Sequence, residues 1–500
     1  MLFFSGIGNG LGDELWMSDG TESGTRLLKD INPGALGSSP TSFVTLPNGN
    51  VVFTAIDDAH GYELWITDGT ETGTSLLSDI YNGGTSSNPE ELTLHNGSVF
   101  FRARDVANGF ELWISDGTTA GTSLVKNIDP NVDGTPRSLT SALNLLFFRA
   151  TENGDVEPWI SNGTTGGTVR LKDVATGAAA SFPDNFTVFN GALYFSASDA
   201  NGDVGLWKTN GTEATTVLVT NIGPDLGGGN RPSTFTVADG VLYFFADDGN
   251  GRQLWKSDGT AGGTRAVSSL DGVGFGPLVA YQGVLFFPAT GLNRNREELW
   301  TYRPATDDLA IYVDISGGAS GPELTNPDQL TVFDGKLFFS AEVDGSGDRQ
   351  LFVSDGVNFL VIERVAPDIA PETNNIPIGP SSAFVEYKGN LYVAANFNSA
   401  GMELWRIEGT NVSIDEHTHT LEGVEVYPQP AGDGFTLSLA QATDATSYQV
   451  VSLSGSVVHS GSINGTLTYV DISHLAAGSY IIELLDGAAS KHHQLIVVQR

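Results

Sequence analysis

The residues most able to do chemistry in this chain recur in one short unit, Glu-Leu-Trp-x-Ser-Asp-Gly-Thr-x-x-Gly-Thr. Its clearest copy starts at Glu111 and ends at Thr122. Other copies, some weaker, begin at Glu14, Glu63, Glu157, Gly205, Gln253, Glu298, Gln350 and Glu403. An indole and a carboxylate two residues apart in a strand lie on one face. Such a pair could bind a sugar through ring contact and hydrogen bonding.

The eight tryptophans all occupy the same place in this unit, and Phe352 takes that place in the remaining copy. They are Trp16, Trp65, Trp113, Trp159, Trp207, Trp255, Trp300 and Trp405. A residue repeated in every unit is more economically structural, because a binding site normally breaks the symmetry of a repeat. We expect the Trp to fill the space between neighbouring units and the Glu to accept hydrogen bonds from a nearby turn. A ring of sugar-binding Trp–Glu pairs is the alternative.

Other candidate groups carry weaker signals. Carboxylates gather in the loops before the third strand of a unit, at Asp57, Asp58, Asp105, Asp199, Asp203, Asp247, Asp248 and Asp344. Oxygen ligands of this kind suit calcium, but none has the spacing of a defined calcium loop. We therefore expect no cofactor, with calcium as the alternative.

Four further signals favour ordinary structure over catalysis or metal binding. His417 and His419 lack a third metal ligand, and residues 227–229 lack the Lys-Ser/Thr of a phosphate loop. The eight histidines form no Ser/His/Asp grouping, so no catalytic residue is predicted. Asn162 and Asn210 replace the Asp of the unit, which favours a turn over a metal site.

The elements that must position these residues are four short strands per unit, as at residues 186–189, 192–196, 206–208 and 217–219. Asn190-Gly191 between the first two is a type I′ hairpin signal. Four antiparallel strands in about 45 residues are typical of a propeller blade. The fold class is therefore all-β, with a propeller favoured over a β-solenoid. The first unit begins at its second strand, so we expect eight to nine blades.

The composition of the chain limits the classes of partner that it can bind. The chain has 59 acidic and 24 basic residues, for a net charge of −35, which disfavours nucleic acid and anionic membrane surfaces. It has no cysteine and no apolar run long enough to span a membrane.

The repeat ends near residue 410. Beyond residue 422 seven strand-like segments follow, at 424–428, 435–439, 448–451, 457–459, 467–470, 479–484 and 494–498. They predict a small Ig-like β-sandwich. The predicted domains are residues 1–410, a linker at 411–421, and residues 422–500.

Both parts resemble known families. The repeat resembles the ELWxxDGT repeat family of secreted bacterial proteins, which implies a secreted or surface array without a settled activity. The tail is similar to the C-terminal sorting domain of the type IX secretion system of Bacteroidetes. The matching residues are Pro428, Pro430, Gly434, Gly455, Leu475, Gly478, Tyr480 and Lys491.

The second resemblance implies that the secretion machinery is a partner and that the protein reaches the cell surface or the medium. Export needs a signal peptide, and none precedes the strand at residues 1–4, so we expect further coding sequence upstream of Met1. The predicted function is binding or scaffolding of an unknown extracellular glycan, protein or matrix. The alternative is a polysaccharide-active enzyme with carboxylates at the propeller mouth.

Overall fold

The computed structural model describes most of the propeller and the strands of the tail. The described residues are 1–8, 10–34, 36–177, 179–224, 231–267, 276–290, 297–312, 324–343, 349–356, 359–361, 384–395, 403–408, 424–427, 434–439, 447–452, 457–463, 466–475, 478–486 and 489–498. Asp344, His417, His419 and residues 227–229 lie outside them, as do Pro428, Pro430 and Gly455. No helix of the described part is long and apolar enough to cross a membrane.

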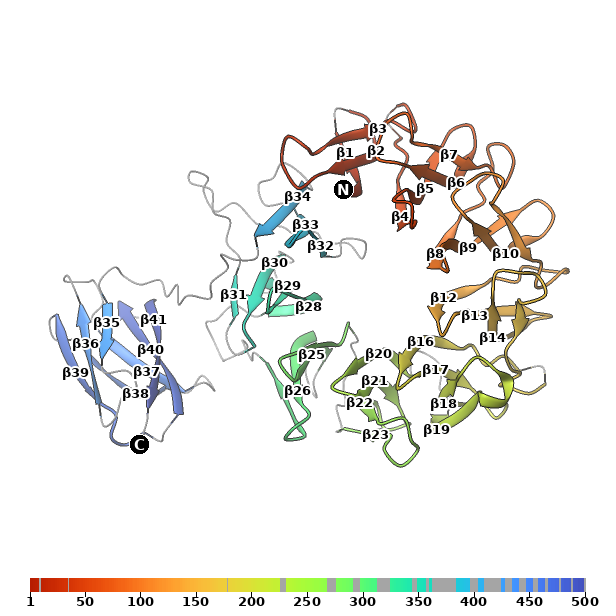
Figure 1. The fold of residues 1–500 in the computed structure, drawn as a ribbon. Helices are drawn as coiled ribbons and strands as arrows, with labels where there is room; N and C mark the ends of the chain where they lie inside the picture. The colour runs from red at the N-terminus through yellow and green to blue at the C-terminus, as the bar shows by residue number, and fades with distance from the viewer. Residues whose placement is uncertain are drawn as a thin grey trace.

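Nine antiparallel sheets, counted over the described residues before 409, stand around a common centre (Figure 1). The strands nearest the centre are β4 (Thr41–Thr45), β8 (Glu90–His95), β12 (Arg137–Ala142), β16 (Asp184–Phe189), β20 (Ser233–Ala238), β24 (Val279–Tyr281), β28 (Leu324–Phe333) and β32 (Val385–Tyr387). The second strands are β1 (Leu2–Ile7), β5 (Val51–Asp57), β9 (Ser98–Asp105), β13 (Leu145–Glu152), β17 (Ala192–Ser198), β21 (Val241–Asp247), β25 (Val284–Thr290), β29 (Lys336–Val343) and β33 (Asn390–Ala395).

The third strands carry the repeated motif. They are β2 (Asp13–Ser18), β6 (Gly61–Thr67), β10 (Gly109–Ser115), β14 (Asp155–Ser161), β18 (Asp203–Thr209), β22 (Arg252–Ser257), β26 (Glu297–Arg303), β30 (Arg349–Ser354) and β34 (Glu403–Glu408). The outer strands are β3 (Arg26–Lys29), β7 (Ser75–Ser78), β11 (Ser123–Lys126), β15 (Val169–Arg170), β19 (Val217–Pro224), β23 (Arg265–Ala266), β27 (Asp308–Ile311) and β31 (Phe359–Val361). A 3₁₀ turn, η1 (Glu213–Thr215), precedes β19. The propeller prediction is confirmed, with nine blades.

The hydrophobic core lies between the blades. In β9 five consecutive residues are buried, because both faces of the sheet pack against neighbours. One inter-blade cluster joins Leu46, Val52, Leu64 and Leu77 of the second blade to Val99, Phe101, Ala103 and Trp113 of the third. The same arrangement repeats around the ring, so stacking supplies the burial that a single sheet lacks.

The ring closes through side chains. The first blade contains β1–β3 without an inner strand, as its sequence predicts. Arg406 Nη1 of the ninth blade donates to the Gly20 carbonyl at 3.0 Å, and Lys388 Nζ donates to the Asp19 carbonyl at 3.3 Å. Figure 1 shows the two blades side by side.

The tail forms the seven predicted strands, arranged in two sheets. One has the order β35 (Val424–Tyr427), β36 (Gly434–Leu439), β39 (Leu467–Asp471), and the other β38 (Val457–Ser462), β37 (Ser447–Ser452), β40 (Gly478–Asp486), β41 (Ala489–Val498). Phe435 and Val470 of one sheet share a core with Val450 and Ile482 of the other. The boundaries of the linker, which lies outside the described residues, remain a prediction.

Replacing Trp113 by Ala should lower the free energy of unfolding by about 3–5 kcal/mol, because the indole fills the space between two blades. Trp113→Phe is the matched control, since Phe352 occupies this place in the eighth blade and is itself 1% exposed. Denaturant unfolding followed by tryptophan fluorescence measures both. An equal loss in the two variants would contradict a role in filling volume.

Candidate functional site

The repeated Trp and Glu face the inside of the protein. Trp65, Trp113, Trp159, Trp207 and Trp255 are each 9% exposed or less, and Trp16, Trp300 and Trp405 are partly buried. Glu14, Glu63, Glu111 and Glu157 are fully buried. Side chains that solvent does not reach cannot form a ring of open sugar sites, so the function must lie elsewhere.

The Glu carboxylate holds the chain that leaves the blade. Glu63 Oε2 accepts hydrogen bonds from the Ile80 N–H at 3.0 Å and the Ser87 hydroxyl at 2.5 Å. Its Oε1 accepts from the N–H groups of Tyr81 at 3.3 Å and Ser87 at 2.8 Å. The N–H groups 17 and 18 residues after the Glu also donate to Glu14, Glu111 and Glu157. The predicted bonds to a nearby turn are therefore confirmed, and they satisfy backbone groups that leave the ladder.

The fifth blade shows what happens without this carboxylate, because Gly205 replaces the Glu. There β19 runs for eight residues and pairs with β18 as far as Pro224. In blades with the Glu the outer strand has two to four residues, as in β7 and β15. A carboxylate that captures the N–H groups 17 and 18 residues later draws the chain away from the sheet. In the fifth blade, where Gly205 stands in its place, the ladder continues.

Burial raises the pKa of three of these carboxyls, those of Glu63, Glu111 and Glu157. The pKa of Glu111 and of Glu157 rises to about 7, and that of Glu63 also rises, in each case mainly because the charged form is desolvated. An acid whose pKa is raised on folding stabilises the protein most below its unfolded pKa. That stability is lost as the pH rises through the folded value.

We expect the propeller to become more stable as the pH falls from about 8 to about 5, and Glu111→Gln to flatten part of that dependence. Gln253 occupies this place in the sixth blade and is 7% exposed, so the fold accepts an amide there. Relief of the overall negative charge acts in the same direction in both proteins, so the difference between them isolates Glu111. Thermal unfolding across this range measures it; parallel curves would contradict the assignment.

The Ser-Asp-Gly-Thr segment is a self-contained turn. Asp68 Oδ1 accepts from the Thr70 N–H at 2.8 Å and the Thr70 hydroxyl at 2.6 Å, and Thr70 Oγ1 accepts from the Gly73 N–H at 3.0 Å. A Cβ on Gly73 would lie 2.0 Å from the Asp68 carboxylate, which explains the second Gly of the motif. Gly69 has φ 88° and Asp68 is not among the positive-φ residues, so this turn differs from the type I′ turn at Asn96-Gly97, where both φ are positive.

The loop aspartates considered for calcium also close turns. Asp57 Oδ1 accepts from the N–H groups of Ala59 and His60, and Asp105 Oδ1 from those of Ala107 and Asn108. Asp199 and Asp247 do the same for their own loops. These contacts account for their recurrence without an ion.

A departure from the repeat symmetry occurs where the chain enters the inner strand. Ser39, Asn88, Thr135 and Phe182 are equivalent residues with φ between 41° and 47°. A small polar residue tolerates this left-handed conformation better than a bulky one. Phe182 is the exception, and its ring is 45% exposed. A strained aromatic residue held out to solvent calls for a functional explanation.

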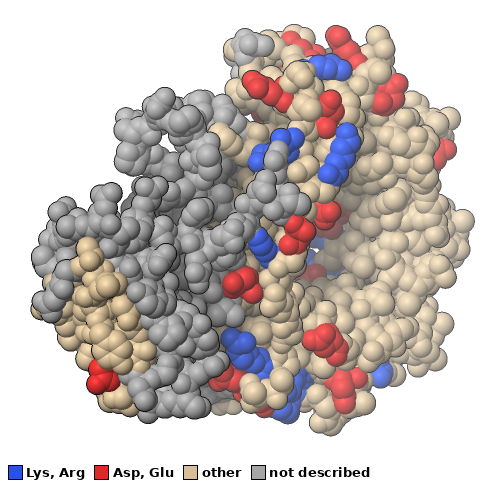
Figure 2. Space-filling view, turned by 60° about the vertical axis from the view of Figure 1, so that its left-hand side comes forward, with Lys and Arg blue, Asp and Glu red and all other residues tan. Residues whose placement is uncertain are grey.

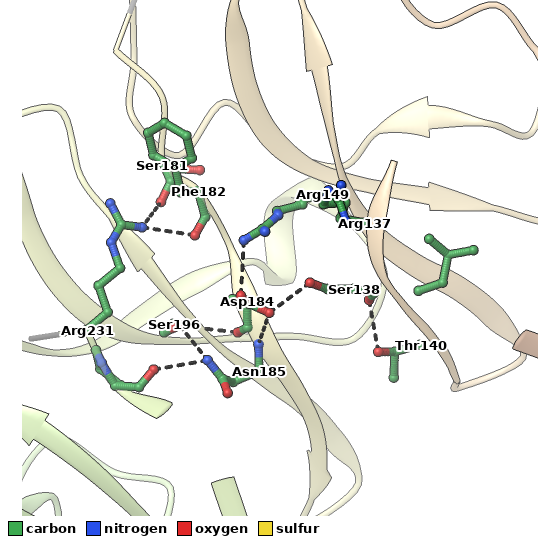
Figure 3. Close-up of polar contacts among 12 residues, drawn as sticks. Arg137, Ser138, Thr140, Arg149, Ser181, Phe182, Asp184, Asn185, Ser196 and Arg231 are labelled. Atoms are coloured by element: carbon green, nitrogen blue, oxygen red, sulfur yellow. Dashed lines mark hydrogen bonds and ion pairs between the residues drawn. The ribbon is translucent and has the colours of Figure 1, made fainter. Parts of the chain in front are cut away.

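Phe182 has a basic neighbour across the blade boundary. Thr234 and Asn185 occupy equivalent places in successive blades, and both have a left-handed conformation, with φ of 57° and 59°. Arg231 lies three residues before Thr234, and Phe182 lies three before Asn185, so Arg231 is the counterpart of Phe182 in the next blade. The Arg231 guanidinium lies over the Phe182 ring, 5.2 Å from its centroid. Its Nη1 donates to the carbonyls of Ser181 at 3.2 Å and Phe182 at 3.0 Å. These bonds set the guanidinium on the ring (Figure 3).

Polar side chains from two blades continue this surface (Figure 3). Asp184 Oδ2 accepts from Arg149 Nη1 at 3.0 Å, and its Oδ1 accepts from the Ser138 hydroxyl and the Asn185 N–H, both at 2.8 Å. Arg137 lies nearby with a side chain 42% exposed, 3.7 Å from Glu90 and 3.8 Å from Glu91. We define the rim site as Phe182, Arg231, Asp184, Arg149 and Arg137.

The rim site combines groups whose chemistry suits an anionic ring-shaped ligand. Phe182 offers an apolar face, and guanidinium groups such as those of Arg231, Arg149 and Arg137 match carboxylate or sulfate oxygens. Arg149 and Arg137 are also ion-paired with acidic side chains of the protein, so a ligand would share them. Asp184 is already held by three donors, which leaves it poorly suited to act as a general base. Acidic and basic side chains are interspersed on the described surface in Figure 2, so the net charge does not make every face negative.

Sequence reasoning missed the rim site. The available signal was the alignment of Ser39, Asn88 and Thr135 with Phe182, in which Phe182 is the one aromatic residue.

The structure describes five of the predicted sorting residues. Leu475 is buried, with 6% of its surface exposed, and Gly434 begins β36. Gly478 and Tyr480 lie in β40, and Lys491 lies in β41.

Comparison with known proteins gives two partial likenesses. The chain is 28% identical over 132 residues to the endo-acting ulvan lyase of Formosa agariphila, which covers 26% of this chain and 25% of that protein. It is 28% identical over 127 residues to ulvan lyase NLR42 of Nonlabens ulvanivorans, covering 25% and 22%. The chain thus aligns with about a quarter of the length of each relative.

Solved structures match more of the chain at lower identity. Porphyromonas gingivalis dipeptidyl peptidase 4 gives a TM-score of 0.45 at 10% identity, over 72% of this chain and 57% of that one. A structure from a study of two prolyl endopeptidases gives 0.39 at 12% identity, over 72% and 56%.

A family model matches the tail. Residues 425–499 match the secretion system C-terminal sorting domain. This match, together with the nine-bladed ring before it, identifies a secreted β-propeller protein whose C-terminal domain addresses it to the type IX secretion machinery.

Proposed function

We propose that this protein acts outside the cell as a binding protein for an acidic saccharide, which it holds at the rim site. The observation that carries the proposal is Phe182, an exposed aromatic in a left-handed conformation where three other blades have Ser, Asn or Thr. The contact with Arg231 pairs a surface for stacking a sugar ring with a donor for its charged group.

Other features support an extracellular ligand of this class. The likeness of the repeat to the ELWxxDGT family is consistent with a surface array in a Bacteroidetes cell. Two partial relatives are ulvan lyases by name, so ulvan is a sensible first probe. Binding is favoured over the enzyme alternative because Asp184 is occupied by Arg149, Ser138 and its neighbour's N–H.

Phe182→Asn should weaken binding of acidic oligosaccharides at least about tenfold, which is about 1.4 kcal/mol. Asn88 holds the equivalent place in the third blade, so this variant should fold at least as well as the parent. Val188→Ala is the control, because Val188 is an exposed apolar residue, 48% exposed, on β16, the inner strand that Phe182 precedes.

Isothermal calorimetry with ulvan oligosaccharides, uronic-acid oligosaccharides and neutral counterparts measures these affinities. Equal binding by Phe182→Asn and the parent would overturn the assignment of the site. Preference for the neutral sugars would overturn the role of the arginines. Release of shortened, unsaturated products during the titration would support the enzyme alternative.

Removing residues 422–500 should leave a folded propeller with nearly unchanged thermal unfolding, because the two tail sheets share a core of their own. In a Bacteroidetes host, with a signal peptide supplied, the truncated protein should stay in the periplasm. Cell fractionation beside the full chain measures this. Appearance of the truncated protein in the medium would contradict the tail's role as the export signal.

A further inference from the structure

Three carboxylates meet in the fourth blade, close to the segment that carries Phe182, because the Ser181 hydroxyl donates to Glu157 Oε2 at 2.8 Å. Asp155 begins β14, Glu157 follows two residues later on the same strand face, and Asp173 comes after β15. Each offers an oxygen, and the three oxygens lie within 4.8 Å of one another. Within the described residues, this is the one group of three His, Cys, Asp or Glu side chains with that geometry.

Two of these carboxylates have buried oxygens that lack a donor. Asp155 is 8% exposed, and its Oδ1 and the Oδ1 of Asp173 have no hydrogen-bond partner in the described part of the chain. Asp155 Oδ2 accepts from Arg170 Nη1 at 2.7 Å. Glu157 accepts hydrogen bonds from the N–H groups of Val174 and Ala175 and from the Ser181 hydroxyl, all of them neutral donors. Among the described contacts, Arg170 therefore balances one of the three carboxylate charges, which leaves two. Buried charges of this kind are normally paired or bound to a metal.

Other blades resolve the same crowding with neutral or cationic side chains. In the third blade Asn127 replaces the last Asp and donates through Nδ2 to Asn108 at 2.9 Å. In the fifth, Gly205 replaces the Glu and Asn221 Nδ2 donates to Asp203 at 2.8 Å.

The first two blades offer further solutions. In the second, His60 lies beside Asp57 at 2.8 Å, and its pKa is raised by that hydrogen bond, with smaller contributions from Asp57, Asp79 and Glu63. In the first, Asp13 is adjacent to Glu14 and so points to the other strand face, which leaves a pair rather than three. The fourth blade alone among these five keeps three acids together.

We propose that Asp155, Glu157 and Asp173 bind a divalent cation, with calcium as the preferred ion. Calcium accepts carboxylate oxygens in flexible geometry and completes its shell with water or backbone carbonyls. Its charge matches the two that Arg170 leaves unbalanced, and it coordinates the two donorless oxygens. Bound there, it ties β14 to the segment that leaves the blade after β15.

The test is calcium titration of the full chain by calorimetry at pH 7.5, with thermal unfolding in parallel. We expect one site and a higher melting temperature with calcium, because the ion binds the folded state. Asp173→Asn should weaken binding at least about tenfold, the scale seen even for groups outside the ligand shell. Asn127 shows that the fold accepts an amide at this place.

Asp30→Asn is the matched control, because Asp30 Oδ1 is also buried without a partner but belongs to a cluster with only two acids on one face. It should bind calcium like the parent. The proposal is overturned if calcium, magnesium and manganese give no binding heat at millimolar concentration, or if Asp30→Asn and Asp173→Asn lose affinity equally. If Asp173→Asn does not fold, Asp155→Asn takes its place under the same criteria.

Discussion

The first four blades are shaped by a buried carboxylate that binds backbone N–H groups from outside its own strand. A four-stranded sheet has no intrinsic reason to stop after a short outer strand, since the ladder can continue as it does in β19. The motif Glu supplies a competing set of acceptors, and Glu63 takes four hydrogen bonds from residues 80, 81 and 87. The chain is thereby turned inward to start the next blade. Hydrophobic side chains of the two blades then pack against each other and bury both sheet faces.

Because that bond is repeated, the repeated residues are committed to architecture. Glu111 accepts hydrogen bonds from the N–H groups of Ile128, Asp129 and Gly134, and Trp113 packs on the blade before it, so both side chains are turned away from solvent. Chemistry directed at other molecules can arise only where one blade differs from the rest. The aromatic at Phe182 and the triple acid cluster around Glu157 are two such departures. Both lie near the junction of the fourth and fifth blades, where the repeated contacts between blades fix their positions.

Much of the fold could be predicted from the sequence, because period, turn residues and strand patterning are local signals. The four strands per blade, the incomplete first blade and the seven strands of the tail all follow from them. The contacts between blades do not, because Arg231 and Phe182 are 49 residues apart and no local pattern joins them. Nor could the role of the Asp-Gly pairs be separated by sequence. Asn96-Gly97 forms a tight hairpin, whereas Asp68-Gly69 caps a longer turn through its carboxylate.

Ring closure has a consequence for how such a gene can change length. Each complete sheet is encoded by one uninterrupted stretch, and the first and last blades meet through Arg406 and Lys388 on backbone carbonyls of residues 19 and 20. In the described residues, no strand of the first blade pairs with a strand of the ninth. An in-frame duplication of one repeat therefore adds one whole blade. The Arg406 and Lys388 side chains then have to reach the carbonyls of residues 20 and 19 in the enlarged ring. Recombination between similar repeats can thus change the number of blades while the same kind of contact closes the ring.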